Sequence, residues 1–292
     1  MPGPPLTAVR DAVLAWAGTA GRDLPWRHTR DPWAVLVSEL MLQQTQVARV
    51  APRWDAFVER FPTPVACAAA PVGDVVSAWQ GLGYNRRAVT LHRAAEAIVA
   101  RHDGSLPSDL DALVALPGVG PYTARAVLSF AFEADVGLVE TNSARVLARA
   151  VAGRPLSRAE AQAAADELVP AGRGWAWNSA VTDLGATVCT KRAPACTACP
   201  IVALCRWAGA GRPSADPAEA TAGVGRRQSA FVGSDRQGRG RLVDALRRGP
   251  VALDGLDRAA GWPDQHERAL RVAAGLVADG LAELTGGVLV LP

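Results

Sequence analysis

The chain of 292 residues contains a single lysine, Lys191, although lysine and arginine together number 31. This shortage of side-chain amines excludes most mechanisms that require one, such as a Schiff base with the substrate. Runs of 18 consecutive apolar residues are also missing, so we expect no membrane span. The first residues lack a basic start followed by an apolar core, so we expect no signal peptide.

Cysteine is scarce, and five cysteines in a chain without an expected leader argue against a secreted disulfide scaffold. The net charge of +3 is compatible with a polyanionic partner but is not evidence for one. Hydrophobic residues make up 49% and charged residues 20%, which excludes wholesale disorder. The length itself predicts two compact domains of about 150 residues each.

Apolar residues from Leu6 to about Leu204 mostly recur at intervals of three and four, the period of a helix. Proline and glycine clusters interrupt this pattern, and strand-like alternation is scarce. The pattern predicts a mainly α fold with about ten short helices in this part. The small, polar, Pro- and Gly-rich stretch from Gly209 to Gly225 is typical of a linker.

The residues after this stretch predict a small domain of their own. Helices are expected over 238–248, 253–260 and 266–278, followed by a hairpin that turns at Gly286-Gly287. Three helices and a hairpin indicate a winged-helix-like domain. Its basic run could contact a DNA backbone, although a solvated charged face explains it equally well; the run consists of Arg236, Arg239, Arg241, Arg247 and Arg248.

Four cysteines lie within 17 residues in the pattern C-x6-C-x2-C-x5-C, at positions Cys189, Cys196, Cys199 and Cys205. Four thiols so close together predict either a zinc site or an iron–sulfur cluster. Zinc ribbons usually pair two C-x2-C knuckles and only one is present, so the spacing favours a 4Fe–4S cluster. Cys67 stands alone in an apolar helix, and we expect it to be a core residue.

The segment LPGVGPYTARAVLSF, from Leu116 to Phe130, predicts two helices joined by a tight glycine turn. Proline at position 121 suits the first turn of the second helix, where its missing N–H has no consequence. Backbone N–H groups exposed near a helix N-terminus can bind a phosphate without reading sequence. An ordinary helical hairpin is the alternative.

Two carboxyl groups are candidates for acid–base chemistry. Glu39 is flanked by apolar residues, and burial there would raise its pKa and suit it to proton donation; exposure on a polar helix face is the alternative. Glu140 precedes a predicted helix, whose dipole would favour the charged carboxylate, although capping is its other possible role. One neutral and one ionised carboxyl group is the arrangement that cleavage of an N-glycosidic bond needs.

Several motifs, taken together and in this order, resemble those of a known enzyme family. They are RDLPWR (22–27), SELMLQQTQV (38–47), GLGYNRRA (81–88), LPGVGPYTARAV (116–127), ETNSARVLAR (140–149), DLGATVC (183–189) and the four cysteines. The chain resembles the helix-hairpin-helix DNA glycosylases that carry an iron–sulfur cluster and, within them, the MutY-type adenine DNA glycosylases. The resemblance covers roughly Leu14 to Trp207.

The resemblance implies a six-helix barrel facing a cluster-bearing helical domain, with a small C-terminal winged-helix-like domain beyond them. The implied division assigns 32–137 to the barrel with its helix-hairpin-helix, 1–31 and 138–208 to the iron–sulfur domain, 209–225 to the linker and 226–292 to the C-terminal domain. It also implies a 4Fe–4S cofactor, double-stranded DNA with a mismatched or oxidised base pair as partner, a monomer, no membrane, and a bacterial-type cytoplasmic location.

Roles for single residues follow from the same resemblance. Glu39 would protonate adenine opposite 8-oxoguanine or G, and Glu140 would stabilise the cationic sugar. Tyr122 would bind the second carboxylate, and Asn142 would hold that carboxylate or a nearby phosphate. Arg27 would contact the base or the surroundings of Glu39, and Gln44 would fill the stack at the lesion. The DNA- or base-binding set is Arg27, Gln43, Gln44, Tyr84, Gly118 and Gly120, and the cluster ligands are Cys189, Cys196, Cys199 and Cys205.

Tyr122 stands where the related endonuclease III branch carries a lysine that attacks the sugar. Tyrosine cannot form an imine, so the sequence predicts a monofunctional glycosylase.

Three departures from the family pattern bear on specificity. Glutamate stands at position 140 where the family usually has aspartate, Asn85 replaces a second tyrosine, and a C-terminal Nudix-like domain is missing. These departures keep two alternatives open: a related glycosylase that acts on T or U opposite G, and a catalytically weak protein that binds DNA lesions.

Overall fold

The computed structural model describes residues 5–223 and 230–292, and this part of the chain is mainly helical, as predicted. It divides into two compact units, each of which draws on separate stretches of the chain. The first unit comprises residues 1–32, 108–110 and 120–227, and the second comprises 33–107, 111–119 and 228–292. Residues 1–4 and 224–229 lie outside the described residues. The second of these ranges includes the last residues of the predicted linker and the first residues of the predicted C-terminal domain.

This division differs from the predicted one in two respects. The barrel was expected to extend to residue 137, whereas residues from Gly120 onward belong to the first unit. The C-terminal residues were expected to form a separate domain, whereas they group with residues 33–107. The reason is packing, because the contacts that join these segments are tertiary and leave no periodic signal in the sequence.

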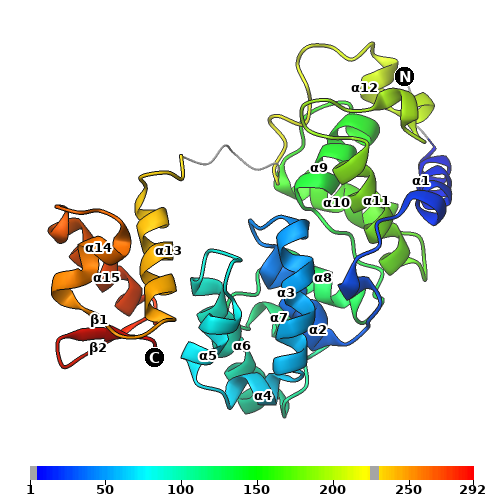
Figure 1. The fold of residues 1–292 in the computed structure, drawn as a ribbon. Helices are drawn as coiled ribbons and strands as arrows, with labels where there is room; N and C mark the ends of the chain where they lie inside the picture. The colour runs from blue at the N-terminus through cyan, green and yellow to red at the C-terminus, as the bar shows by residue number, and fades with distance from the viewer. Residues whose placement is uncertain (1–4, 224–229) are drawn as a thin grey trace. The chain divides into compact units, whose positions relative to one another are not determined.

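The helices of the first unit surround an apolar core. They are α1 (Leu6–Ala20), α8 (Pro121–Phe130), α9 (Thr141–Val146), α10 (Arg158–Leu168), α11 (Gly174–Thr187) and α12 (Arg206–Gly209). Val13 of α1, Leu147 after α9 and Leu184 of α11 are each at most 2% exposed and belong to this core, and Figure 1 shows α1 beside α11. The helix α9 continues as a π-helical segment, η2 (Leu147–Ala152), a rare form that often marks functional positions.

Part of the predicted linker is packed against the first unit. Thr221 is 4% exposed and its hydroxyl accepts a hydrogen bond from the Leu156 N–H at 3.1 Å. The N–H of Ala222 donates to the Leu156 carbonyl at 3.0 Å. Small polar residues predicted a flexible segment here, but the structure uses their backbone and hydroxyl groups as hydrogen-bonding partners.

The second unit combines short helices with a small sheet. Its helices are α2 (Pro32–Leu42), α3 (Val47–Arg60), α4 (Pro64–Ala68), α5 (Val72–Ala78), α6 (Arg86–His102), α7 (Leu110–Val114), α13 (Asp235–Leu246), α14 (Leu256–Ala260) and α15 (His266–Ala278). Cys67 of α4 is fully buried, as predicted, and burial raises the pKa of its thiol to about 12.

The C-terminal elements appear in the predicted order, helix, helix, helix and hairpin. The hairpin consists of β2 (Glu283–Thr285) and β3 (Val288–Val290), and both glycines of its turn have positive φ, at 58° and 80°. Such a turn matches the twist of the strands, which explains the Gly-Gly pair. A strand that was not predicted, β1 (Val251–Ala252), pairs antiparallel with β3 and gives the order β1-β3-β2.

None of the helices in residues 5–223 and 230–292 combines the length and the apolar character needed to cross a membrane.

Candidate active site, cysteine loop and arginine cavity

Glu39 lies in the middle of α2, a helix that is buried along nearly its whole length. Every residue from Trp33 to Met41 is buried, and Glu39 itself is 5% exposed. The alternative of an exposed glutamate on a polar face is therefore excluded. Buried carboxyl groups are uncommon, since burial disfavours the charged form, and this environment suits a group that must donate a proton.

Glu140 is the N-cap of α9 and forms a reciprocal capping box with Ser143. Its Oε1 accepts a hydrogen bond from the Ser143 N–H at 2.8 Å, and the Ser143 hydroxyl accepts one from the Glu140 N–H at 2.9 Å. The other carboxylate oxygen, Oε2, accepts from Asn142 Nδ2 at 3.1 Å. The cap is the alternative role that the sequence offered for Glu140, and the contact with Asn142 is one of the two roles that the resemblance implied for Asn142.

The pKa of Glu140 is shifted in the direction opposite to the one that the helix dipole predicts. Burial raises the pKa of this carboxyl group, and it outweighs the hydrogen bonds from Asn142 and Ser143 and the nearby Arg145 and Arg22 charges, which lower it. The helix dipole predicted a carboxylate biased toward ionisation, but loss of hydration is the larger effect here. Glu39 belongs to the second unit and Glu140 to the first, so their convergence on one bond stays a prediction.

The glycine turn has one position that only glycine fits. Gly118 has a φ of 74°, and a Cβ there would lie 2.1 Å from the Thr90 methyl carbon. Gly120, by contrast, has open space where a Cβ would lie and precedes α8, where Pro121 takes the first turn as predicted. Tyr122 follows and is partly buried. Phosphate binding by this turn and the role of Tyr122 stay predictions.

Arg27 pairs with a buried aspartate of the same unit. Its two terminal nitrogens pair with both oxygens of Asp183, at 2.7 and 2.8 Å, and Arg22 Nε binds the same carboxylate. Asp183 is 1% exposed, and a buried carboxylate must be paired. This pairing joins the N-terminal segment to α11, and the contact of Arg27 with a base or with the surroundings of Glu39 stays a prediction.

The four clustered cysteines line one apolar recess of the first unit. The remaining wall is mainly aliphatic and includes Val146, Leu184 and Ile201. Burial and, to a smaller extent, the other thiols raise the pKa of Cys199 to about 11, although a backbone hydrogen bond from Ile201 lowers it. Thiols in such surroundings need a cation, or a cluster, to hold them as thiolates.

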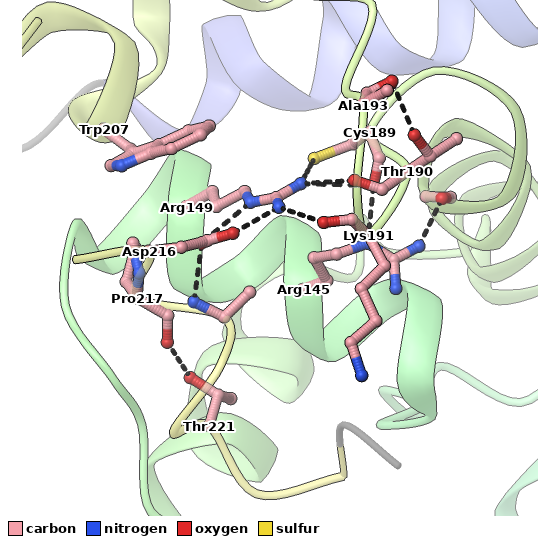
Figure 2. A network of polar contacts seen from close by, with 12 residues as sticks. Arg145, Arg149, Cys189, Thr190, Lys191, Ala193, Trp207, Asp216, Pro217 and Thr221 are labelled. Atoms are coloured by element: carbon pink, nitrogen blue, oxygen red, sulfur yellow. Dashed lines mark hydrogen bonds and ion pairs between the residues drawn. The ribbon is translucent and has the colours of Figure 1, made fainter. Parts of the chain in front are cut away.

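Arg149, a residue of η2, lines this recess, and Figure 2 shows it among Cys189, Thr190, Asp216 and Trp207. Its Nη1 lies 3.4 Å from Cys189 Sγ and donates to the Thr190 carbonyl at 2.8 Å. Its guanidinium pairs with both oxygens of Asp216, and the carbon of the guanidinium lies 4.8 Å from the centre of the Trp207 ring. Arg149 is 1% exposed, so this pair is shielded from water.

A second arginine, Arg145, connects the cysteine loop (here residues 189–205, which carry the four clustered cysteines) to Glu140. Arg145 Nη2 donates to Asn142 Oδ1 at 2.9 Å, and Arg145 Nε donates to the Cys189 carbonyl at 2.5 Å. Because Asn142 also holds Glu140, a continuous chain of hydrogen bonds runs from the candidate carboxylate to the backbone of a candidate ligand.

The donor set of the recess fits an iron–sulfur cluster. Four thiols and one guanidinium face apolar walls, and a hydrogen bond from an arginine to a cysteine sulfur is a known means of stabilising a thiolate cluster. No three His, Cys, Asp or Glu side chains in the described part of the chain are arranged so that they would share a single metal ion.

The predicted base-binding residues Gln43, Gln44 and Tyr84 line a separate cavity of about 790 Å³ in the second unit, here called the arginine cavity. Gln44 and Tyr84 have positive φ angles of 56° and 46°, which non-glycine residues rarely adopt. The structure thus brings these three residues together, as the resemblance implied. Gly118 and Gly120 are not among the described residues that line this cavity.

Arg87 holds the two loops that carry these residues. Its Nη1 donates to the carbonyls of Leu40, Met41 and Gln43, and its Nη2 donates to Thr45 Oγ1 and to the carbonyls of Leu82 and Gly83. Its Nε donates to the Tyr84 carbonyl at 3.4 Å, and all seven of these acceptors are uncharged. Burial lowers the pKa of Arg87 to about 10, the nearby Tyr84 acting in the opposite direction, and the guanidinium remains charged at neutral pH.

Three residues of these sites, Arg87, Arg149 and Asp216, were not predicted from the sequence. Arg87 and Arg149 lie inside the motifs GLGYNRRA and ETNSARVLAR, so the motifs contained them without indicating their roles. Asp216 lies in the stretch interpreted as a linker, and no local signal marks it.

Comparisons with known proteins find relatives over nearly the whole chain. The family described as HhH-GPD superfamily base excision DNA repair protein matches residues 37–171. An adenine DNA glycosylase of Mycolicibacterium smegmatis is 44% identical over 280 residues, covering 94% of this chain and 92% of that protein.

Two solved structures share the fold. A thermostable thymine-DNA glycosylase is 28% identical with a TM-score of 0.66, and the match covers 70% of this chain and 97% of that one. Endonuclease III, trapped in a covalent intermediate with DNA, is 25% identical with a TM-score of 0.62, over 71% of this chain and 98% of that one.

Proposed function

The chain belongs to the HhH-GPD superfamily of base excision DNA repair proteins, and from this membership we propose that it is a monofunctional adenine DNA glycosylase. Its substrate would be duplex DNA with adenine opposite 8-oxoguanine or guanine, and the reaction would be hydrolysis of the N-glycosidic bond. The observation that carries the proposal is the 44% identity to an adenine DNA glycosylase over 94% of this chain.

Glu39 would act as the general acid. Its burial in α2 favours the protonated carboxyl group, which can transfer a proton to adenine near N7 and so improve the leaving group. Glu140, held by Ser143 and Asn142, would stabilise the positive charge that develops on the sugar. Water then completes the hydrolysis, because Tyr122 offers no amine that could attack the sugar.

The four cysteines would hold a 4Fe–4S cluster, with Arg149 as hydrogen-bond donor to Cys189. Such a cluster, when bound, ties together segments of chain that have little regular structure of their own. Arg149 and Asp216 would fix one side of its site. An absorbance shoulder near ~400 nm in protein purified anaerobically would support the cluster, and its absence would contradict it.

Labelled duplexes that carry A opposite 8-oxoguanine, A opposite G, T opposite G and U opposite G distinguish the candidate functions. We expect strand cleavage after hot alkali only in the duplexes with adenine. Cleavage at T or U would favour the second candidate, which the similarity to a thymine-DNA glycosylase structure keeps open. Cleavage without alkali would contradict the monofunctional assignment.

Glu39→Gln should leave DNA binding largely intact and slow adenine release by about 10²-fold or more, the usual scale for general acid catalysis. Single-turnover excision and equilibrium binding measured on the same duplex separate the two effects. Exposed Glu59→Gln, in the neighbouring helix α3, is the matched control and should not change the rate. Equal rates for wild type and Glu39→Gln would remove Glu39 from the mechanism.

A further inference from the structure

We propose that Asn178 of α11 is a positioning residue for Glu140, the carboxylate that would stabilise the cationic sugar. This inference rests on the proposed function and concerns how its site is held in place. Residues 133–139, which lead into Glu140, have no regular secondary structure of their own. The position of Glu140 therefore depends on the side chains that hold residues 136–138, here called the approach segment.

The side-chain amide of Asn178 binds the approach segment at two points. Asn178 Oδ1 accepts a hydrogen bond from the Leu138 N–H at 3.1 Å, and its Nδ2 donates to the Val136 carbonyl at 2.8 Å. These two backbone groups lie on the same side of an extended chain, so the amide takes the place that a peptide group of a neighbouring strand would have. Asn178 is fully buried, and few side chains other than an amide both donate and accept in this way.

Gly137, the middle residue of the approach segment, is held from the opposite side by helix α10. Its N–H donates to Asp166 Oδ1 at 2.8 Å, and its carbonyl accepts from Gln162 Nε2 at 3.0 Å. A Cβ at this position would lie 2.3 Å from the carbonyl carbon of Ala165, so only glycine lets the segment lie this close to α10. The approach segment is thus fixed on both of its hydrogen-bonding sides.

The end of the approach segment is bonded directly to the cap that contains Glu140. The Leu138 carbonyl accepts a hydrogen bond from the Ser143 hydroxyl at 2.8 Å, and the same hydroxyl accepts one from the Glu140 N–H at 2.9 Å. The Val136 N–H donates to the Ala134 carbonyl at 2.9 Å, so every backbone N–H and C=O of the segment has a partner. A shift of the approach segment would therefore move the backbone of Glu140.

The length of the side chain at position 140 makes this support more important. Glutamate has one rotatable bond more than the aspartate of the family pattern, so its carboxylate can occupy more positions for a given backbone. A fixed backbone reduces the number of these positions. A displacement of about 1 Å at a reacting group can cost about 10²-fold in rate, so loosening the segment should slow the reaction even if the fold is kept.

The test measures single-turnover release of adenine by the full-length protein and its equilibrium binding to the same duplex. We expect Asn178→Ala to slow adenine release by about 10²-fold and to leave binding unchanged. Asp166→Ala, whose side chain is 41% exposed, loosens the same segment without opening the core and should give a smaller loss in the same direction. Loss of binding equal to the loss of rate, or unchanged rates in both variants, would overturn the proposal.

Two further variants separate positioning from a general loss of stability. Val13→Ala opens a cavity in the same core and should lower the melting temperature without slowing adenine release. In a Glu140→Asp background, Asn178→Ala should cost less in rate than in the wild type, because the shorter side chain depends less on its support.

The difference between the two backgrounds should exceed about twofold, the limit within which independent sites usually add. The same loss in both backgrounds would show that Asn178 does not act through Glu140 and would overturn the proposal. The proposed function fails separately, if wild-type protein releases no adenine from adenine duplexes after alkali.

Discussion

Two arginines hold loops in two regions of this molecule by opposite electrostatic means. Burial opposes the charge of Arg149, but hydrogen bonds with Asp216 and Cys189 and their negative charges outweigh it and raise the pKa of the guanidinium. Arg87 has only neutral acceptors, and burial lowers its pKa to about 10. The region around Arg149 is therefore neutralised within the protein, whereas the region around Arg87 keeps a positive charge that an external anion can satisfy.

This difference separates a structural site from a recognition site. A cysteine loop that would surround a cluster gains from a paired, dry arginine, because an unpaired buried charge is strongly destabilising. An arginine without a carboxylate partner, such as Arg87, keeps a charge that remains available to an anion such as phosphate. Four predictions test the contrast.

The largest effect is expected from Arg149→Met. This change leaves Asp216 without its partner and should lower the free energy of unfolding by roughly 3–5 kcal/mol, with loss of bound iron. Urea unfolding and iron content measure the two consequences. The control is Arg154→Met, whose pair with Glu160 is largely exposed and should contribute little. If Arg149→Met kept the stability and the iron content of the wild type, Arg149 would have no structural role at the cysteine loop.

Arg87→Lys should lower the free energy of unfolding by about 1–3 kcal/mol and also weaken DNA discrimination. An ammonium group has three donors and cannot serve seven acceptors, so carbonyls of both loops lose partners. Urea unfolding and binding to the four duplexes provide the readout. Arg101→Lys, exposed on the same helix, is the control. If the variant lost stability but kept its DNA discrimination, Arg87 would have a structural role like that of Arg149.

Acid should weaken the Arg149 region selectively. Burial opposes ionisation of Asp216, but the hydrogen bond and charge of Arg149 prevail and hold its pKa below the usual value of 3.8. A carboxyl group whose pKa is lower in the folded state contributes stability above its unfolded pKa, and this is lost as pH falls through the folded pKa.

The acid effect can be followed by the fluorescence of Trp207 and by the release of iron as the pH is lowered from 6 to about 2. Asp216→Asn should already show at neutral pH the weakened state that the wild type reaches in acid. The loops around Arg87 contain no carboxylate acceptor and should show no matching transition. A transition of equal size in Asp216→Asn would assign it to another carboxyl group.

The smallest effect concerns the outer face of the cysteine loop, where Lys191 and Arg192 are exposed. If they contact DNA phosphates, Lys191→Ala and Arg192→Ala should each reduce the slope of log affinity against log salt by about 1 and leave opposite-base discrimination unchanged. Fluorescence anisotropy at several salt concentrations measures the slope. An unchanged slope would limit phosphate contacts to other parts of the chain.

The sequence by itself determined the helical class and the C-terminal hairpin, because each depends on residues close together in the chain, whereas it left open whether Glu39 is buried and whether Glu140 caps a helix. Periodicity, glycine at positive φ and cap chemistry are local effects, and local effects can be recognised in a sequence. The motifs also indicated the family, and the cysteine spacing indicated where a cluster would lie.

Only the tertiary structure decided which charges meet. Arg27 pairs with Asp183 across 156 positions, Arg149 with Asp216 across 67, and Arg247 with Asn85 across 162. The raised pKa of Glu140 has the same origin, since burial is a property of packing and not of the helix end alone. Electrostatic and hydration energies depend on distance and exposure in space, and neither quantity is encoded at a single position of the chain.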